Sequence, residues 1–164
     1  MKRRKFPLIF VVEDDVFYAN AIEKQLQNEH LTQIEVYHSG KTAVDNLYKI
    51  PEIVLLDHGL GDSDGLTILK QIKGLYPEIQ VIFLSAQEEL EVAINALKYG
   101  AYDYIDKGDD GLLKMASVVR RAFQLNYLLA ENERYHFLSK ITVPIVVLFI
   151  LIVWSIIMLL QNGF

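Results

Sequence analysis

Apolar and polar positions alternate along most of the chain in a pattern that predicts five strands, each followed by a helix. Short apolar runs predict strands near residues 8–12, 33–37, 53–56, 80–84 and 102–105. Helix-like patterns follow near 15–28, 41–49, 65–75, 88–99 and 110–133. This alternation favours an α/β fold, a doubly wound five-stranded parallel sheet with helices on both faces and right-handed crossovers.

The apolar pattern also separates central strands from edge strands. Residues 53–56 and 81–84 are continuously apolar, as strands buried on both faces should be. The strand with Ile34 and Val36 alternates more, which predicts an edge. In the last helix, apolar residues recur every three or four positions. This spacing favours packing of the first half of the helix on the sheet, and a homodimer interface along the same residues is the alternative. That stripe comprises Met115, Val118, Ala122, Leu125 and Leu129.

A run of twenty residues without charge, 141–160, predicts a transmembrane helix. At about 1.5 Å per residue it measures about 30 Å, the hydrocarbon thickness of a bilayer, and a buried core helix is the alternative. Lys140 and the arginines before it favour the cytoplasmic side of the inner or plasma membrane for the rest of the chain. The expected segments are a basic tail 1–5, a domain 6–125, a helical stalk 126–140, the span 141–160 and a short tail 161–164.

Composition removes several function classes. The chain of 164 residues has no cysteine, so disulfides, thiolate catalysis and Cys-based metal sites are excluded. Its net charge of -5 and dispersed basic residues predict no direct nucleic-acid binding. The basic cluster at residues 2–5 either rests on anionic headgroups or forms a solvated tail.

Carboxylates stand where two predicted strands end. Asp57 follows the strand 53–56, and Glu13, Asp14 and Asp15 follow the strand 8–12. The carboxyl ends of parallel strands meet at one edge, so these groups would converge and repel unless a hard cation lay among them. Mg²⁺ is the expected cofactor.

Several separated motifs together resemble the receiver domains of two-component response regulators, over about residues 6–125. The resemblance implies a flavodoxin-like strand order, 2-1-3-4-5. The matching segments are Val11-Val12-Glu13-Asp14-Asp15, Leu55-Leu56-Asp57, Asp64-Gly65, Leu84-Ser85-Ala86 and Gly100-Ala101-Tyr102-Asp103-Tyr104-Ile105-Asp106-Lys107.

The resemblance assigns a phosphoryl-transfer role to Asp57. In such domains the matching aspartate attacks the phosphohistidine of a sensor histidine kinase or phosphotransfer protein and becomes an acyl phosphate. The metal would be held by Asp14, Asp57 and the backbone carbonyl of Gly59, with Glu13 acting through water. Lys107 would pair with a phosphoryl oxygen.

The resemblance also implies a switch. The Ser85 hydroxyl would donate a hydrogen bond to the phosphoryl group, and Tyr104 would follow Ser85 inward and reshape the surface near residues 88–99. Gly59 and Gln87 would line the route of attacking water. His58 is expected to point away from the acceptor, toward a partner.

Each of these residues also has a structural reading. Asp14 or Asp15 could be a helix N-cap, Ser85 a turn residue, Lys107 a solvated charge and Tyr104 an edge-strand aromatic. Gly61 and Gly108 stand where the family often has proline, which makes both loops more pliable and leaves the placement of Lys107 open.

Three functions follow from these features. The first is a membrane-anchored receiver that switches binding to a downstream protein or drains phosphoryl groups from a kinase, with self-phosphorylation and slow autodephosphorylation as its only chemistry. The second is an unphosphorylated membrane adapter. The third, a phosphohydrolase using an aspartyl phosphate, would want an acidic residue at position 59, where this chain has glycine.

Overall fold

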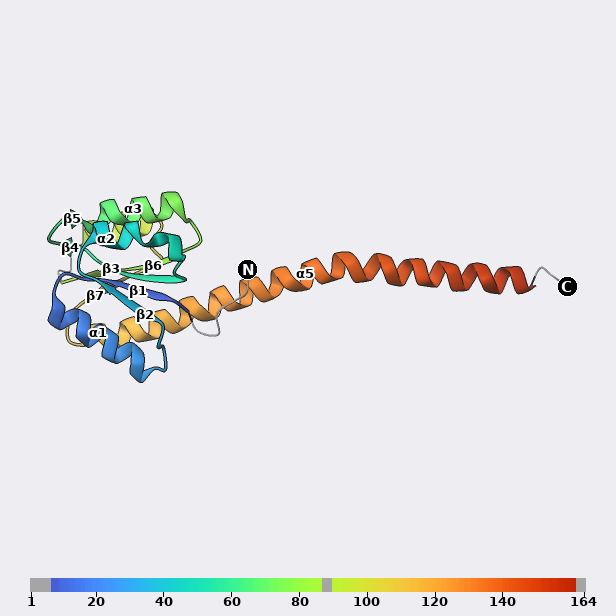
Figure 1. Cartoon of the computed structure of the whole chain (residues 1–164), viewed down its shortest axis with the longest axis horizontal. Coiled ribbons are helices and arrows are strands. Elements are labelled where there is room, and N and C mark those ends of the chain that lie inside the picture. Colours follow the sequence, from blue (N-terminus) through green and yellow to red (C-terminus); the bar gives the residue numbers. More distant parts are fainter. Residues whose placement is uncertain (1–6, 87–89, 162–164) are drawn as a thin grey trace. The chain divides into compact units, whose positions relative to one another are not determined.

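The computed structural model describes residues 7–86 and 90–161, and some side chains between 126 and 161 lie outside that description. Within it, five parallel strands form one sheet with the order β2-β1-β3-β6-β7 (Figure 1). These strands are β1 (Ile9–Val12), β2 (Ile34–Tyr37), β3 (Ile53–Asp57), β6 (Gln80–Ser85) and β7 (Asp103–Asp106). The predicted fold class and strand order are confirmed, with β2 at an edge as expected.

Helices cover both faces of this sheet (Figure 1). They are α1 (Val16–Asn28), α2 (Gly40–Asp45), α3 (Gly65–Leu75), α4 (Leu90–Lys98) and α5 (Gly111–Gln161). One buried cluster joins α2, α3 and α4 to side chains such as Phe10 and Phe83, and a second joins α1 and α5 to side chains such as Ile9 and Leu55. The alternation of strand side chains between two covered faces explains why the central strands are continuously apolar.

The register places the carboxyl ends of the strands at one edge. Val12 of β1 pairs with Leu56 of β3, and Asp57 pairs with Leu84 of β6. Ser85 in turn pairs with Asp106 of β7. Groups that follow β1, β3, β6 and β7 in the sequence therefore meet at this edge.

Two local structures differ from the sequence prediction. The helix expected over 41–49 ends at Asp45 and is followed by a short 3-10 turn, η1 (Leu47–Lys49). At the break, the Asn46 side chain donates a hydrogen bond to the Thr42 carbonyl, the type of side-chain competition that ends helices. A small hairpin, β4 (Gly59–Leu60) with β5 (Ser63–Asp64), fills what was expected to be loop.

The last helix divides between two compact units, Met1–Gln124 and Leu125–Phe164. In the first unit Met115, Val118 and Ala122 are buried in the core, which confirms sheet packing for the first half of the stripe. Beyond it α5 continues to Gln161 with Pro144 inside the helix.

The predicted span over 141–160 is not supported by the structure. Among the described residues, no helix combines the length and the apolar character needed to cross a membrane. Several positions of the predicted span have side chains outside the description, namely 147, 155–157, 159 and 160. The basic residues 2–5 also lie outside it.

Asp62, in the hairpin turn, binds the N-terminus of α2. Its carboxylate accepts hydrogen bonds from the Ser39 hydroxyl at 2.7 Å and from the Gly40 amide at 3.0 Å. The Ser39 bond and then the Gly40 bond lower the pKa of Asp62 to about 2. The hairpin beside the acceptor loop is thereby tied to the helix that follows β2.

We expect Asp62→Ala to lower the free energy of unfolding at neutral pH by about 1 kcal/mol, the usual cost of a lost cap on an exposed site. Since the folded pKa lies below the ordinary value of 3.8, the stabilisation is present above that value and is lost as the pH falls through about 2. Urea unfolding at pH 7, 4 and 2 measures it. Equal losses at pH 7 and pH 2 would contradict this role.

Candidate functional site

Three carboxylates gather at the carboxyl edge of the sheet. Asp57 is the last residue of β3, and Glu13 and Asp14 directly follow β1. One carboxylate oxygen from each lies within 4.8 Å of the others. Glu13 is 1% exposed and Asp57 5% exposed, while Asp14 is open to solvent. The strand ends thus bring together the three acidic side chains that the sequence predicted.

Asp14 and its neighbour Asp15 accept hydrogen bonds from different parts of the chain. Asp15 is the N-cap of α1, because its carboxylate accepts hydrogen bonds from the Phe17 and Tyr18 amides. Asp14 instead accepts a hydrogen bond from the Gly61 amide at 3.0 Å, across 47 residues of sequence. The structural alternative therefore applies to Asp15, and Asp14 remains available to the carboxylate cluster.

Lys107 reaches into this cluster from the segment after β7. Its ammonium lies 2.6 Å from Glu13 Oε2 and 2.7 Å from Asp57 Oδ1, and the side chain is 13% exposed. Burial opposes the charged ammonium, but the hydrogen bonds to Asp57 and Glu13 outweigh it, so the pKa of Lys107 is raised. Lys107 is a largely buried, doubly paired cation, not the solvated charge of the alternative reading.

The pKa of the Glu13 carboxyl is affected by its burial among other acidic groups. Burial, and then repulsion from Asp57, raise the pKa of Glu13, although the hydrogen bond from Lys107 opposes the rise. One ammonium cannot neutralise three carboxylates. The excess negative charge and the all-oxygen donor set of Glu13, Asp14 and Asp57 fit a hard divalent cation such as Mg²⁺.

Glycines let the backbone pass close to Asp57. A side chain at Gly65 would place its Cβ 2.3 Å from the Asp57 carbonyl oxygen, so only glycine fits there. This explains the Asp64-Gly65 pair, in which Asp64 caps α3 and the Gly65 amide bonds the His58 carbonyl. Gly59 borders the acceptor, since a Cβ there would lie 3.8 Å from Asp57 Oδ2.

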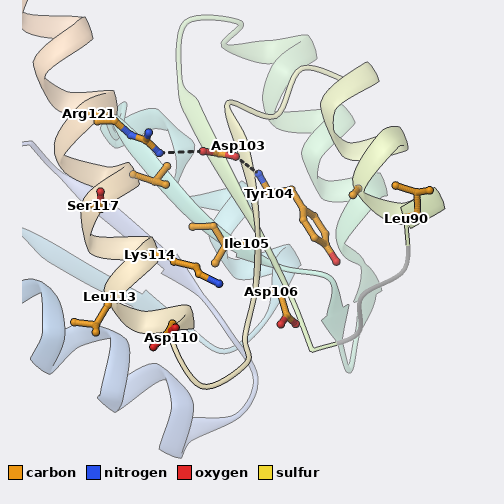
Figure 2. Close-up of a pocket in the computed structure, with 12 residues that line it drawn as sticks. Leu90, Asp103, Tyr104, Ile105, Asp106, Asp110, Leu113, Lys114, Ser117 and Arg121 are labelled. Carbon is orange, nitrogen blue, oxygen red and sulfur yellow. Dashed lines mark hydrogen bonds and ion pairs between the residues drawn. The ribbon is translucent and has the colours of Figure 1, made fainter.

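Ser85 and Tyr104 occupy adjoining strand ends. Ser85 closes β6 and is 2% exposed, and its carbonyl accepts a hydrogen bond from the Lys107 amide at 2.7 Å. Tyr104, on the edge strand β7, is half-buried, and its ring centroid lies 6.5 Å from that of Phe83. Tyr104 lies on the side of β7 that faces α4, in a pocket (Figure 2).

This pocket, of about 940 Å³, is a feature that the sequence did not predict. Its lining comes from α4, β7 and the start of α5, and includes Leu90, Tyr104 and Leu113 (Figure 2). An ion pair between Asp103 and Arg121 borders it at 3.5 Å. A movement of Tyr104 would therefore change the shape of a surface hollow beside α4.

His58 packs away from the carboxylate cluster. Its ring lies 5.7 Å from the Phe83 ring, and its Nδ1 lies 3.7 Å from an Asp64 oxygen. This agrees with the expected direction of the side chain, and contact with a partner stays a prediction. Gln87, expected on the route of attacking water, lies outside the described residues.

Tyr18 is a further residue at the site that the sequence did not indicate. Its ring centroid lies 4.6 Å from the Lys107 ammonium. Only an aromatic residue three positions after the N-cap of α1 could have hinted at this contact, and many such residues pack in cores.

Comparison with known proteins agrees with the geometry. Residues 9–116 match the family described as "Response regulator receiver domain". The Escherichia coli K12 protein named "DNA-binding transcriptional regulator NtrC" is 33% identical over 116 residues, covering 70% of this chain and 24% of NtrC. The Vibrio vulnificus "Regulatory protein LuxO" is 29% identical over 96 residues, covering 56% of this chain and 21% of LuxO. The chain thus spans about a quarter of the length of these relatives.

Solved structures show the same fold. The receiver domain of NtrX from Brucella abortus has 30% identity and a TM-score of 0.66, covering 71% of this chain and 98% of that domain. The BeF3-activated DrrB receiver domain has 26% identity and a TM-score of 0.66, covering 73% and 98%. With its carboxylate cluster and buried lysine at the carboxyl edge of such a sheet, this chain belongs to the response regulator receiver domain family.

Proposed function

We propose that this chain accepts a phosphoryl group on Asp57 from a histidine kinase or phosphotransfer protein and thereby switches its binding to a downstream protein. The observation that carries the proposal is the Lys107 ammonium, bonded to both Asp57 and Glu13 beside the Asp14 carboxylate. An unphosphorylated adapter would have no need of a buried lysine held between two carboxylates.

Phosphoryl transfer needs a nucleophile, a cationic group that binds the phosphoryl oxygens, and a leaving group. An Asp57 carboxylate oxygen attacks phosphorus, the bond from phosphorus to the donor's imidazole nitrogen breaks, and the imidazole leaves with that electron pair. Lys107 orients the carboxylate through Oδ1 and stabilises negative charge on the phosphoryl oxygens. The product is an acyl phosphate on Asp57.

Glu13, Asp14 and Asp57 would hold Mg²⁺, and the Gly59 carbonyl is the further ligand that the family resemblance implies. When bound, the cation would offset negative charge on the carboxylates and the phosphoryl group. The fit rests on the oxygen donors gathered within 4.8 Å of one another. Burial first, and then repulsion from Asp57, raise the pKa of Glu13, and a bound cation would favour its charged form.

The signal would leave the site through Ser85 and Tyr104. Ser85 lies next to Lys107 along the sheet edge, and Tyr104 lines the pocket beside α4. Drawing the Ser85 hydroxyl toward the phosphoryl group would let Tyr104 move inward and alter that pocket. A protein that only drains phosphoryl groups would take up the group without any change at the pocket.

The test is the intact mass of the full chain after incubation with a small-molecule phosphodonor, with Mg²⁺ and with a chelator. We expect a gain of one phosphoryl group that depends on Mg²⁺. No gain in either condition would favour the adapter function.

We also propose that residues 141–160 anchor the chain in a membrane, with the receiver domain on the cytoplasmic side. The support is the sequence, with twenty uncharged residues in succession and basic residues before them. Large apolar side chains such as Phe149 and Trp154 are also exposed on this helix, 66% and 60%.

Removing residues 141–164 should shift the protein from the membrane pellet to the supernatant after carbonate extraction. Each lipid-facing apolar residue lost removes part of the insertion free energy, so the shift should be nearly complete. The matched control removes only residues 161–164 and should stay in the pellet. An intact chain found in the supernatant would contradict the anchor.

A further inference from the structure

We propose that Tyr18 is a positioning residue for Lys107, with its aromatic face holding the ammonium beside Asp57 and Glu13 and its hydroxyl end near the start of α5. The inference rests on the proposed phosphoryl transfer, because it assigns Tyr18 to that same site. It concerns how the lysine is held, and no described contact brings Tyr18 to the acceptor itself.

The position of Tyr18 follows from the first turn of α1. Asp15 caps the helix and accepts a hydrogen bond from the Tyr18 amide at 3.3 Å. Ala19 and Ile22 point into the core, so Tyr18 lies on the flank between the core and solvent, partly buried against the α1 and α5 cluster. The preceding residue, Phe17, is 83% exposed and faces away.

The ammonium of Lys107 has two kinds of neighbour. The carboxylates of Glu13 and Asp57 lie 2.6 and 2.7 Å away, and the centroid of the Tyr18 ring lies 4.6 Å away. A cation over an aromatic face is attracted more strongly when water is excluded, as it is around this 13% exposed side chain. The ring therefore supplies attraction that does not compete with the carboxylates for N–H donors.

The other end of Tyr18 meets the segment that carries the lysine. The Tyr18 hydroxyl oxygen lies 3.6 Å from the position that a Cβ would take at Gly111, the first residue of α5. A side chain at Gly111 would also place its Cβ 2.7 Å from the Asp106 carbonyl oxygen, so glycine is required there. The Tyr18 side chain thus contacts the Lys107 ammonium with its ring and has its hydroxyl end near the start of α5.

These contacts answer a question raised by the sequence. Gly108 follows Lys107, and glycine makes that segment pliable. Lys107 is nevertheless held in a defined place, and Tyr18 is a rigid group that spans from its ammonium to Gly111. Removing the ring should make the position of the ammonium less defined, although its bonds to Glu13 and Asp57 remain.

The experiment compares full-length Tyr18→Phe and Tyr18→Leu, with Phe17→Leu as the matched control on the same turn. The first readout is the proton chemical shift of the Lys107 side-chain methylene next to nitrogen, assigned by its loss in Lys107→Arg. The second is the rate of phosphoryl uptake from a small-molecule donor at saturating Mg²⁺. Thermal unfolding checks folding, and Tyr18→Met replaces Tyr18→Leu if the leucine variant does not fold.

We expect an upfield, ring-shifted Lys107 signal in the wild type, in Tyr18→Phe and in Phe17→Leu. In Tyr18→Leu the signal should move to an ordinary lysine value, and uptake should slow about tenfold, as expected for losing one desolvated cation–π contact. An unchanged Lys107 shift in a folded Tyr18→Leu protein would overturn the proposal, whatever happens to the rate. So would a loss in Tyr18→Phe as large as that in Tyr18→Leu, because the hydroxyl would then act instead of the face.

The two readouts separate this proposal from the proposed function. A wild-type protein that takes up no phosphoryl group contradicts the proposed function. The Lys107 shift, measured without any donor, still decides whether the Tyr18 ring lies over the ammonium, and the uptake rate then shows whether that contact positions the lysine.

Discussion

Asp57→Asn is expected to abolish phosphoryl uptake, lowering the rate at least about a hundredfold and below detection by intact mass. The amide is a poor nucleophile and cannot form an acyl phosphate, so the loss concerns the chemical step itself. The substitution also removes one of the two carboxylates bonded to Lys107, but Glu13 keeps the other contact at 2.6 Å. The measurement is the fraction of protein that gains one phosphoryl group over a time course with Mg²⁺.

The matched control for this variant is Asp62→Asn. Asp62 lies in the neighbouring hairpin, is exposed and binds the N-terminus of α2 instead of the site. It should take up the phosphoryl group at the wild-type rate. Uptake by Asp57→Asn equal to that of the control would show that another residue is the acceptor.

Lys107→Ala is expected to destabilise the fold when Mg²⁺ is absent, by about 3 kcal/mol, because it leaves Glu13 and Asp57 buried beside each other without their cation. Burial and the Asp57 charge already raise the pKa of Glu13, so the unpaired carboxylates should be costly at neutral pH. Millimolar Mg²⁺ should restore most of the lost stability, since a cation that binds only the folded site favours it by mass action. Urea unfolding with a chelator and with Mg²⁺ measures both effects.

Lys98→Ala is the matched control, an exposed lysine at the end of α4. It should change the free energy of unfolding little, and Mg²⁺ should stabilise it no more than the wild type. A Lys107→Ala protein that gains no stability from Mg²⁺ would show that the carboxylate cluster binds no cation.

Much of the fold could be predicted because strong local patterns agree with the tertiary arrangement. The apolar runs at 53–56 and 81–84 are buried on both faces and became central strands, and the mixed pattern at 33–37 became an edge. Helix α3 has the predicted bounds because Asp64 caps it and Gly65 is required beside Asp57. The break after Asp45 was missed because it depends on a side-chain hydrogen bond from Asn46.

The part of the site that could be predicted is the part whose residues directly follow strands. Glu13, Asp14 and Asp57 converge because parallel strands end at one edge, a property readable from order alone. The double pairing of Lys107, the Tyr18 ring over it and the bond from Gly61 to Asp14 depend on loop conformations. No periodicity encodes those contacts between distant loops. The predicted span over 141–160 rests on hydropathy alone, and the structure does not support it.

The most direct test of the central claim is to locate the phosphoryl group. After uptake with Mg²⁺, borohydride reduction converts an aspartyl phosphate into homoserine, and peptide mass spectrometry shows which residue was converted. The account predicts conversion at Asp57 alone, with the adjacent His58 unmodified. Conversion at another aspartate, or a phosphoryl group on His58, would contradict it.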